Sequence, residues 1–354
     1  MSDRVHKRYW RTAPGKANLF AFGMLLLLLV GGAGLLIYPR LRLALVQVQQ
    51  SYLLFGTQVD LTVRTKNHDQ AARALAACFQ EMKRIQSLMS VHDEGSQLSQ
   101  LNRSANQGWV TSDPDIFQLI ERSLAISKAS QGAFDITVGS LLEIWRLARQ
   151  RGSPPSEDEI HAEMRYVGYS ALEVDPQDKR VRFHKKGMSL DLGGIAKGYA
   201  LDRGKEALLR EGVQQALLNA GGDILLVGGK GAVPWEIGIR DPRDQSDLLG
   251  TLELRDRAVV TSGDYERVFM HNGERYHHIL DPRTGYPSKG CSSVTVVGPQ
   301  ATEADAIATA AFVLGPEKGL AFLEKTADID GIIIDSEGRK HVTSGLRGKV
   351  KWKH

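Results

Sequence analysis

Residues 188–212, MSLDLGGIAKGYALDRGKEALLREG, predict a strand, a glycine-rich turn and a helix in direct succession. Gly193 and Gly194 stand between the strand and the helix, where glycine favours a turn. Such a turn presents backbone N–H groups at the start of the helix, which is a favourable place for an anion. The alternative is a plain tight turn beside a solvated Lys197, and this segment alone does not distinguish the two.

The segments on both sides of this unit mix strands with helices. Strands are predicted from alternation and turn signals at 51–65, 172–185 (a hairpin), 216–229, 235–242, 249–263, 275–281, 292–298 and 331–342 (a hairpin). Helices are predicted from periodicity and caps at 69–90, 112–132, 141–150, 301–315 and 317–326, with a short helix after the loop at 152–159. Because helices and mostly antiparallel strands are mixed without a repeat or an internal linker, we expect a single α+β catalytic body.

A long apolar run precedes this body. The 23 residues from Ala17 to Pro39 include no charged side chain, and a transmembrane helix needs about 20 apolar residues. The run is longer than the apolar part of a cleaved signal peptide, so we expect an uncleaved signal-anchor. Five Lys or Arg residues precede the run and two follow it closely, which favours a cytoplasmic N-terminus.

These features predict four regions. We expect a cytoplasmic basic tail at 1–16, one transmembrane helix at 17–39, a linker at 40–50 and the catalytic domain at 51–354. The protein would then be a single-pass protein of the inner membrane, with its catalytic body in the periplasm.

The charge distribution argues against nucleic acid as a partner. Residues 1–42 carry a net charge of +6, whereas the rest of the chain carries −2. The basic excess therefore belongs to the flanks of the apolar run, and no basic patch is predicted on the body. The only cysteines, Cys78 and Cys291, could form one disulfide, but two buried free thiols are the favoured interpretation.

The helix predicted at 301–315, ATEADAIATAAFVLG, carries two polar residues one turn apart. Asp305 and Thr309 are four positions apart, so a helix places them on the same face. One interpretation is a capping box with Thr302 as N-cap residue and Asp305 as its partner, and the helix alone favours it. The other is a functional site, because a hard cation prefers oxygen ligands of this kind.

Several familiar motifs are incomplete in this chain. Gly193 to Lys197 does not match the phosphate-loop pattern, and no G-x-G-x-x-G with an acidic partner predicts a nicotinamide site. His277 and His278 lie in a predicted strand, which sends adjacent side chains to opposite faces, so they do not predict a zinc site. The segment TSGDYER (261–267) lacks the strand-to-helix elbow of a hydrolase serine.

Eight motifs follow one another in the order seen in a known family. They are FGT (55–57), FDITVGSLLEIW (134–145), LDLGGIAKGYALD (190–202), NAGGDI (219–224), IRDP (239–242), TSGDYER (261–267), RYHHILDPRTGYP (275–287) and TEADAIATAAFVLG (302–315). Together they make residues 51–345 resemble the ApbE family, the FAD:protein FMN transferases. Each motif is weak alone, but the ordered set is specific.

The resemblance implies roles for individual residues. It implies a Mg²⁺ site formed by Asp305, Thr309 and the backbone carbonyl of Gly194, and a catalytic role for His278. The residues that it implies for FAD binding are Phe55, His92, Ala133, Phe134, Asp135, Asp191, Lys197 and Ile279. This chain has Phe55 where methionine is usual, His92 where an aromatic residue is common and Gln97 where glutamate is common.

The implied activity is Mg²⁺-dependent transfer of FMN from FAD to a Ser or Thr hydroxyl of a partner protein, with release of AMP. Acceptors in this family are subunits of membrane redox complexes that carry a D-G-x-[ST]-G-[AS]-T type of motif. One alternative is an FAD pyrophosphatase, in which water replaces the hydroxyl at the same site. Another is a non-catalytic FAD-binding assembly factor of a respiratory complex, against which the retained Asp305, Thr309 and His278 argue.

Overall fold

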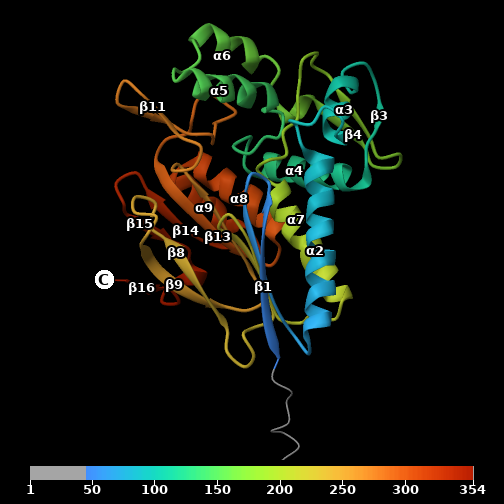
Figure 1. Ribbon diagram of the computed structural model, residues 1–354. Helices are drawn as coiled ribbons and strands as arrows, with labels where there is room; N and C mark the ends of the chain where they lie inside the picture. Colours follow the sequence, from blue (N-terminus) through green and yellow to red (C-terminus); the bar gives the residue numbers. More distant parts are fainter. Residues whose placement is uncertain (1–44, 354) are drawn as a thin grey trace, which may run out of the picture. The chain divides into compact units, whose positions relative to one another are not determined.

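The computed structural model describes residues 45–353, and these form an α+β body (Figure 1). Its strands are β1 (Val46–Leu54), β2 (Thr57–Thr65), β3 (Val110–Thr111), β4 (Leu172–Asp175), β5 (Arg180–Phe183), β6 (Ala216–Ala220), β7 (Asp223–Val227), β8 (Trp235–Arg240), β9 (Leu248–Leu254), β10 (Ala258–Gly263), β11 (Phe269–His271), β12 (Glu274–Tyr276), β13 (Cys291–Gly298), β14 (Asp330–Asp335), β15 (Lys340–Val342) and β16 (Lys351–Trp352). Its α-helices are α2 (His68–Met89), α3 (Gln97–Ser104), α4 (Pro114–Ala129), α5 (Gly139–Arg151), α6 (Glu157–Met164), α7 (Ala196–Arg210), α8 (Ala301–Leu314) and α9 (Pro316–Lys325).

The centre of the body is an eight-stranded sheet in the order β1-β2-β6-β7-β10-β13-β14-β15. Neighbouring strands in this sheet pair antiparallel, as they do in the three smaller sheets of the described residues. The predicted α+β class with mostly antiparallel strands is therefore confirmed. Strand β13 is buried along its whole length because it lies between β10 and β14 and is covered on both faces.

Two layers cover this sheet. Helices α2, α7, α8 and α9 pack on one face and enclose the largest apolar core with it. On the other face, apolar side chains of the sheet β16-β9-β8 form a second core with the central strands. In Figure 1, β8, β9 and β16 lie together at the left of the view, away from α2 and α7.

Helix α8 is the central helix of the first layer. It contacts α7, α9 and the strands β10 and β13, and most of its residues are buried. A helix that is apolar on nearly all sides is buried in a core, as α8 is. Its small alanine side chains leave room for the neighbouring elements to approach closely. The polar residues of α8 are therefore held at fixed positions against the sheet.

A third group of elements lies at one end of the sheet. Helices α5 and α6 pack on the hairpin β11–β12 through Trp145, Phe269 and Tyr276, with Leu141 and Ile160 buried beneath them. These elements are at the top of Figure 1. The small sheet β3-β5-β4 includes the hairpin predicted at 172–185, which is confirmed.

The segment 51–65, predicted as one strand, is a hairpin instead. Strand β1 begins at Val46, within the predicted linker 40–50, and turns back into β2 at Phe55 and Gly56. These two residues have φ values of 54° and 70°, the left-handed pair that a two-residue hairpin turn needs. Alternation of side chains continues through both strands, so it conceals the turn.

Several other sequence predictions can be compared with the described residues. The segment 249–263 divides between β9 in the small sheet and β10 in the central sheet, and α3 was not predicted. Asp113 is the N-cap residue of α4, within the helix predicted at 112–132, and its side chain accepts from the Asp115 N–H. Cys78 and Cys291 are buried free thiols, as favoured. Within residues 45–353 no helix is both long and apolar enough to cross a membrane, and the predicted span 17–39 lies outside the described residues.

Candidate active site

The residues predicted for the site come together around one cavity of about 860 Å³. They are Phe55, His92, Ala133, Phe134, Asp135, Asp191, Gly194, Lys197, His278, Ile279, Asp305 and Thr309. They come from six places in the fold: the β1–β2 turn, the α2–α3 loop, the segment before α5, the turn into α7, the segment after β12, and α8. Most residues that line the cavity therefore lie in the quoted motifs, and the α2–α3 loop with His92 is outside them.

A polar corner of the cavity is formed where the turn before α7 meets α8. Asp305 is only 4% exposed, and its Oδ2 accepts a hydrogen bond from the Gly198 backbone N–H at 3.0 Å. Thr309 lies one turn further, with its hydroxyl 3.3 Å from that of Ser262 on β10. A Cβ atom added at Gly194 would lie 3.7 Å from the Thr309 Oγ1, so the turn passes directly over this hydroxyl.

The start of α8 is capped by another helix. Asp202 on α7 accepts hydrogen bonds from the backbone N–H groups of Ala301 and Thr302, at 3.0 and 2.9 Å, and from the Thr302 hydroxyl at 2.5 Å. The N-cap residue of α8 is Gln300, whose side chain makes no capping bond. The capping-box interpretation is therefore wrong, because a residue about 100 positions away supplies the cap and Asp305 faces the cavity.

The donor set of this corner suits a hard cation. Burial, and next the negative charge of Asp223, raise the pKa of Asp305 to about 7, because they outweigh the positive charge of Lys197 and the Gly198 N–H. Among residues 45–353 its Oδ1 accepts no hydrogen bond, and no cluster of three or more His, Cys, Asp or Glu side chains forms a metal site. Mg²⁺ is usually held by only one or two carboxylates together with phosphates and waters. One carboxylate, one hydroxyl and one carbonyl thus fit such an ion.

Lys197 is not the freely solvated side chain that the plain-turn alternative requires, because it is partly buried and paired with a carboxylate. Its Nζ lies 2.5 Å from Oδ2 of Asp223, a buried residue of the NAGGDI motif. Burial alone would lower the pKa of Lys197, but the charges of Asp223 and Asp305 outweigh it and raise the pKa above its usual value. The ammonium group stays charged and is held at the cavity wall beside the Asp305 corner.

His277 and His278 are not on opposite faces of a strand. Strand β12 ends at Tyr276, and both histidines line the cavity. The His277 ring uses both nitrogens within the protein: Nε2 donates to the Ser288 carbonyl at 3.0 Å, and Nδ1 accepts from the Ile279 N–H at 3.2 Å. The expectation from alternation was therefore wrong, because the His277 ring, and not a neighbouring strand, accepts the hydrogen bond of the Ile279 N–H.

His278 has one ring nitrogen available. Its Nδ1 lies 3.1 Å from the Glu266 carbonyl oxygen, which can only accept, so Nδ1 carries the proton and Nε2 is the basic nitrogen. Burial, and next the positive charge of Arg267, lower the pKa of His278 to about 3. The ring is thus held in its neutral form at neutral pH, which is the form that accepts a proton.

Two predicted carboxylates, Asp135 and Asp191, accept hydrogen bonds that hold the backbone around the cavity. The Asp135 carboxylate accepts from the Thr137 N–H and hydroxyl and from the Tyr169 N–H, at 2.7–2.8 Å. Asp191 accepts from the Gly193 N–H at 2.6 Å and so closes the glycine turn. Burial raises the pKa of both carboxyl groups.

Sequence reasoning did not single out four residues of this site. Ser262 contacts Thr309, Asp223 pairs with Lys197, Glu266 supplies the carbonyl for His278, and Arg267 lowers its pKa. All four stand inside quoted motifs, so the signal was present. Their contacts join segments distant in sequence, which a motif does not reveal.

Comparisons with known proteins agree with this geometry. Residues 55–333 match the model of the ApbE family. The chain is similar to the FAD:protein FMN transferase of Klebsiella pneumoniae (strain 342), with 37% identity over 286 residues, 80% of this chain and 88% of that protein. It is similar to the FAD:protein FMN transferase of Treponema pallidum (strain Nichols), with 32% identity over 323 residues, 86% of this chain and 89% of that protein.

The fold is similar to a solved structure as well. The crystal structure of the ApbE protein from Thermotoga maritima MSB8 aligns with a TM-score of 0.80 and 36% identity, over 86% of this chain and 99% of that one. The likeness thus extends over both the central sheet and the elements that line the cavity.

Proposed function

The chain belongs to the ApbE family, and from this we propose that it transfers FMN from FAD to a hydroxyl group of an acceptor protein. The observation that carries the proposal is the meeting of the Asp305–Thr309 corner, a held lysine and a neutral histidine in one cavity. Transfer of a phosphoryl-type group needs charge neutralisation and a proton acceptor, and these residues offer both.

We assign the corner of Asp305, Thr309 and the Gly194 carbonyl to Mg²⁺. Mg²⁺ held by these groups would supply positive charge that stabilises the negative charge developing during transfer. The protein's part is to hold these oxygens rigidly, which α8 does because it is buried against β10 and β13. Lys197 and the backbone N–H groups at the start of α7 add further donors for phosphate oxygens.

His278 is placed to take the proton of the acceptor hydroxyl. In the proposed step the hydroxyl oxygen forms a bond to the FMN-side phosphorus, and the bond from that phosphorus to the bridging oxygen breaks. AMP leaves with the bridging oxygen, and Nε2 of His278 receives the hydroxyl proton. The hydrogen bond from Nδ1 to Glu266 keeps the other nitrogen protonated, so the basic nitrogen faces the reaction.

The remaining predicted residues provide surfaces for the rest of FAD. Phe134 and Ile279 are buried apolar residues at the cavity wall, and Phe55 and His92 stand at the hairpin turn and the α2–α3 loop. Flat flavin and adenine rings gain by stacking on such side chains. His92, at the position where an aromatic residue is common, therefore still offers a flat ring face for stacking.

The test uses the full-length chain with FAD, Mg²⁺ and a soluble carrier protein that bears an appended D-G-x-[ST]-G-[AS]-T segment. We expect flavin fluorescence in the carrier band after denaturing electrophoresis, and none with a carrier whose Ser and Thr are replaced by Ala. Free FMN and AMP without labelled carrier would instead identify a pyrophosphatase. FAD binding without either product would identify an assembly factor.

We further propose that residues 17–39 anchor the protein in the inner membrane with its body in the periplasm, near acceptor subunits of membrane redox complexes. A tether of this kind raises the effective concentration of enzyme and acceptor. Protease added to spheroplasts should digest the body while a cytoplasmic control survives. A mature N-terminus beyond residue 30, or a body protected from protease, would contradict the anchor.

A further inference from the structure

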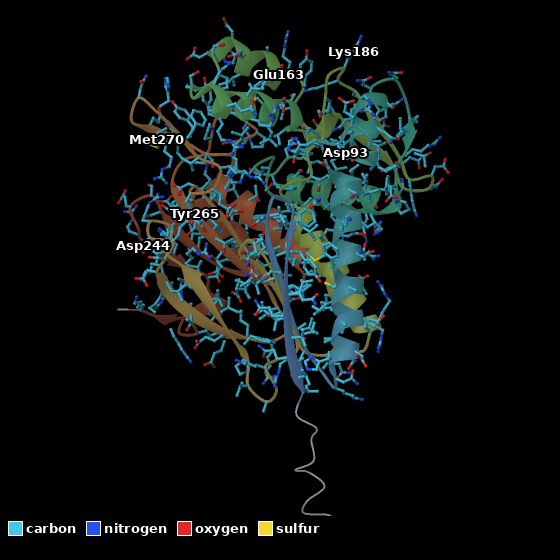
Figure 2. The ribbon with its side chains drawn as sticks, in the orientation of Figure 1. Asp93, Glu163, Lys186, Asp244, Tyr265 and Met270 are labelled. Carbon is cyan, nitrogen blue, oxygen red and sulfur yellow. The ribbon has the colours of Figure 1, made fainter. Side chains whose placement is uncertain are left out.

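Three segments, the β8–β9 loop, the residue that follows β10, and β13, meet at the side chain of Asp264. The Arg243 side chain, from the loop between β8 and β9, donates to both carboxylate oxygens of Asp264, at 2.7 and 2.9 Å. Its Nη2 also donates to the Ser292 hydroxyl on β13 at 2.6 Å. Figure 2 labels their neighbours, Asp244 and Tyr265, on these adjoining segments. Arg243 is not among the residues that line the cavity.

Asp264 is held by hydrogen bonds of both its backbone and its side chain. It is 7% exposed, and its backbone N–H donates to the Ser292 carbonyl at 3.0 Å. The Ser292 hydroxyl in turn donates to the Asp335 carbonyl at 2.9 Å. The backbone N–H of Arg243 donates to Asp241 Oδ1 at 2.8 Å, which holds the loop that carries this arginine. Such a two-pronged pair fixes direction as well as distance.

The held residue begins the loop that orients the catalytic ring. Asp264 directly follows β10, and the Glu266 carbonyl, two residues on, accepts the proton of His278 Nδ1 at 3.1 Å. Arg267 then turns sharply with φ of 49°, which marks a constrained backbone. The direction of the Glu266 carbonyl thus depends on where Asp264 is held.

We propose that Arg243 is a positioning residue for FMN transfer, which fixes through Asp264 the carbonyl of Glu266 that orients His278. The inference rests on the proposed function for its kinetic part. Arg243 touches neither FAD nor acceptor in this account, and it acts only through the ring of His278. An ion pair that merely stabilised the fold would affect FAD binding and every variant background equally.

The kinetic test is a double-mutant cycle with the full-length chain under single turnover. We expect Arg243→Ala to slow transfer by up to about 10²-fold, the loss typical of a reacting group misplaced by about 1 Å, with FAD affinity within twofold of wild type. In the His278→Ala background the same change should have no further effect, because the ring it orients is gone. Arg243→Lys keeps the charge but loses the fork, so it should fold normally and recover part of the rate.

The matched control is Arg84→Ala, which removes an arginine that binds two carboxylates, Glu81 and Asp115, away from the cavity. Its transfer rate should equal that of wild type. An equal loss for Arg243→Ala with and without His278, or a loss of FAD affinity as large as the loss of rate, would overturn the proposal.

A second readout does not depend on the reaction. Ring ¹⁵N shifts of His278, assigned with His278→Gln, should show one tautomer protonated at Nδ1 in wild type and in Arg84→Ala. Arg243→Ala should give a mixture of tautomers, and an unchanged Nδ1 tautomer would refute the positioning role. If wild type failed to transfer FMN, the proposed function would fail while this measurement still decided the role of Arg243.

Discussion

Asp202 on α7 caps α8 by accepting hydrogen bonds from the backbone N–H and the hydroxyl of Thr302. The same helix pair brings the Gly198 N–H to Asp305, so the cap and the corner proposed for Mg²⁺ both depend on the packing of α7 against α8. Because the N-terminus of α8 is satisfied from outside, Asp305 is free to serve the cavity.

Asp202→Ala should destabilise the protein by about 0.5–2 kcal/mol, the cost of losing a helix cap, and should weaken Mg²⁺ binding because α8 is no longer fixed. Urea unfolding and Mg²⁺ titration measure the two effects. Asp113→Ala, which removes the cap of α4, is the control: it should lower stability and leave Mg²⁺ binding unchanged. Equal Mg²⁺ affinity in both variants would show that the α8 cap does not support the corner.

Gly198→Ala should be strongly destabilising, because its Cβ would lie 2.1 Å from the Ala301 carbonyl oxygen. The two helices would have to separate, and overpacking of this kind typically costs about 1–3 kcal/mol. Gly95→Ala is the control, because its Cβ would meet only the flexible Asp93 side chain, at 3.2 Å. Thermal unfolding of both variants decides, and equal midpoints would contradict the close helix contact.

Asp305→Asn should stabilise the ligand-free protein at pH 8. The pKa of Asp305 is raised from 3.8 to about 7, so the folded state binds more protons between these values and loses stability as pH rises through 7. Removing the buried charge should gain on the order of 1–3 kcal/mol at pH 8 and little below pH 4. Mg²⁺ should raise the midpoint of wild type but not of the variant.

Glu303→Gln provides the control on the same helix, since Glu303 makes a part-buried ion pair with Arg122 and does not line the cavity. Its stability should change by no more than about 1 kcal/mol, and it should keep its response to Mg²⁺. A response to Mg²⁺ in Asp305→Asn as large as that of wild type would place the cation elsewhere.

The two histidines should differ in kind. His278→Ala should slow transfer about 10²–10⁴-fold while FAD still binds, because it removes the base. His277→Ala should instead lower stability by about 1–3 kcal/mol, because the buried Ser288 carbonyl and Ile279 N–H lose their partner, with a transfer rate near that of wild type. Single-turnover rates and urea unfolding separate the effects, and the reverse pattern would exchange their roles.

The pKa of His278 also predicts how stability depends on pH. The folded value of about 3 lies below the ordinary 6.5, so the unfolded chain binds the proton more readily. This residue's contribution to stability is therefore full above 6.5 and is lost as pH falls toward 3. Without ligand, His278→Gln should lose less stability than wild type between pH 7 and pH 4, and parallel curves would contradict the depressed pKa.

Local geometry explains which predictions were correct. Asp305 and Thr309 share a face because helix spacing is a local property, and the structure brings them to the cavity. The cap of α8 could not be predicted from the helix, because Asp202 lies far away in sequence and is placed by the α7–α8 packing. The local capping-box rule pairs Thr302 with Asp305, but in the structure the tertiary contact with Asp202 supplies the cap.

The predictions for the histidine pair and for the first hairpin were wrong for a related reason. Alternation predicts a strand through His277 and His278, but the His277 ring takes the Ile279 N–H and ends the regular pairing. In the first hairpin, Phe55 adopts a left-handed conformation that non-glycine residues seldom take. Contacts and strained conformations of this kind concentrate at functional sites, and periodicity does not contain them.

The most direct test of the account is the ratio of AMP released to FMN covalently bound to the carrier protein in a single turnover. For wild type with Mg²⁺ we predict one AMP for each FMN attached to the carrier, and no attachment with Asp305→Ala although this variant stays folded. AMP release with only free FMN, or full attachment by Asp305→Ala in the presence of EDTA, would contradict the account.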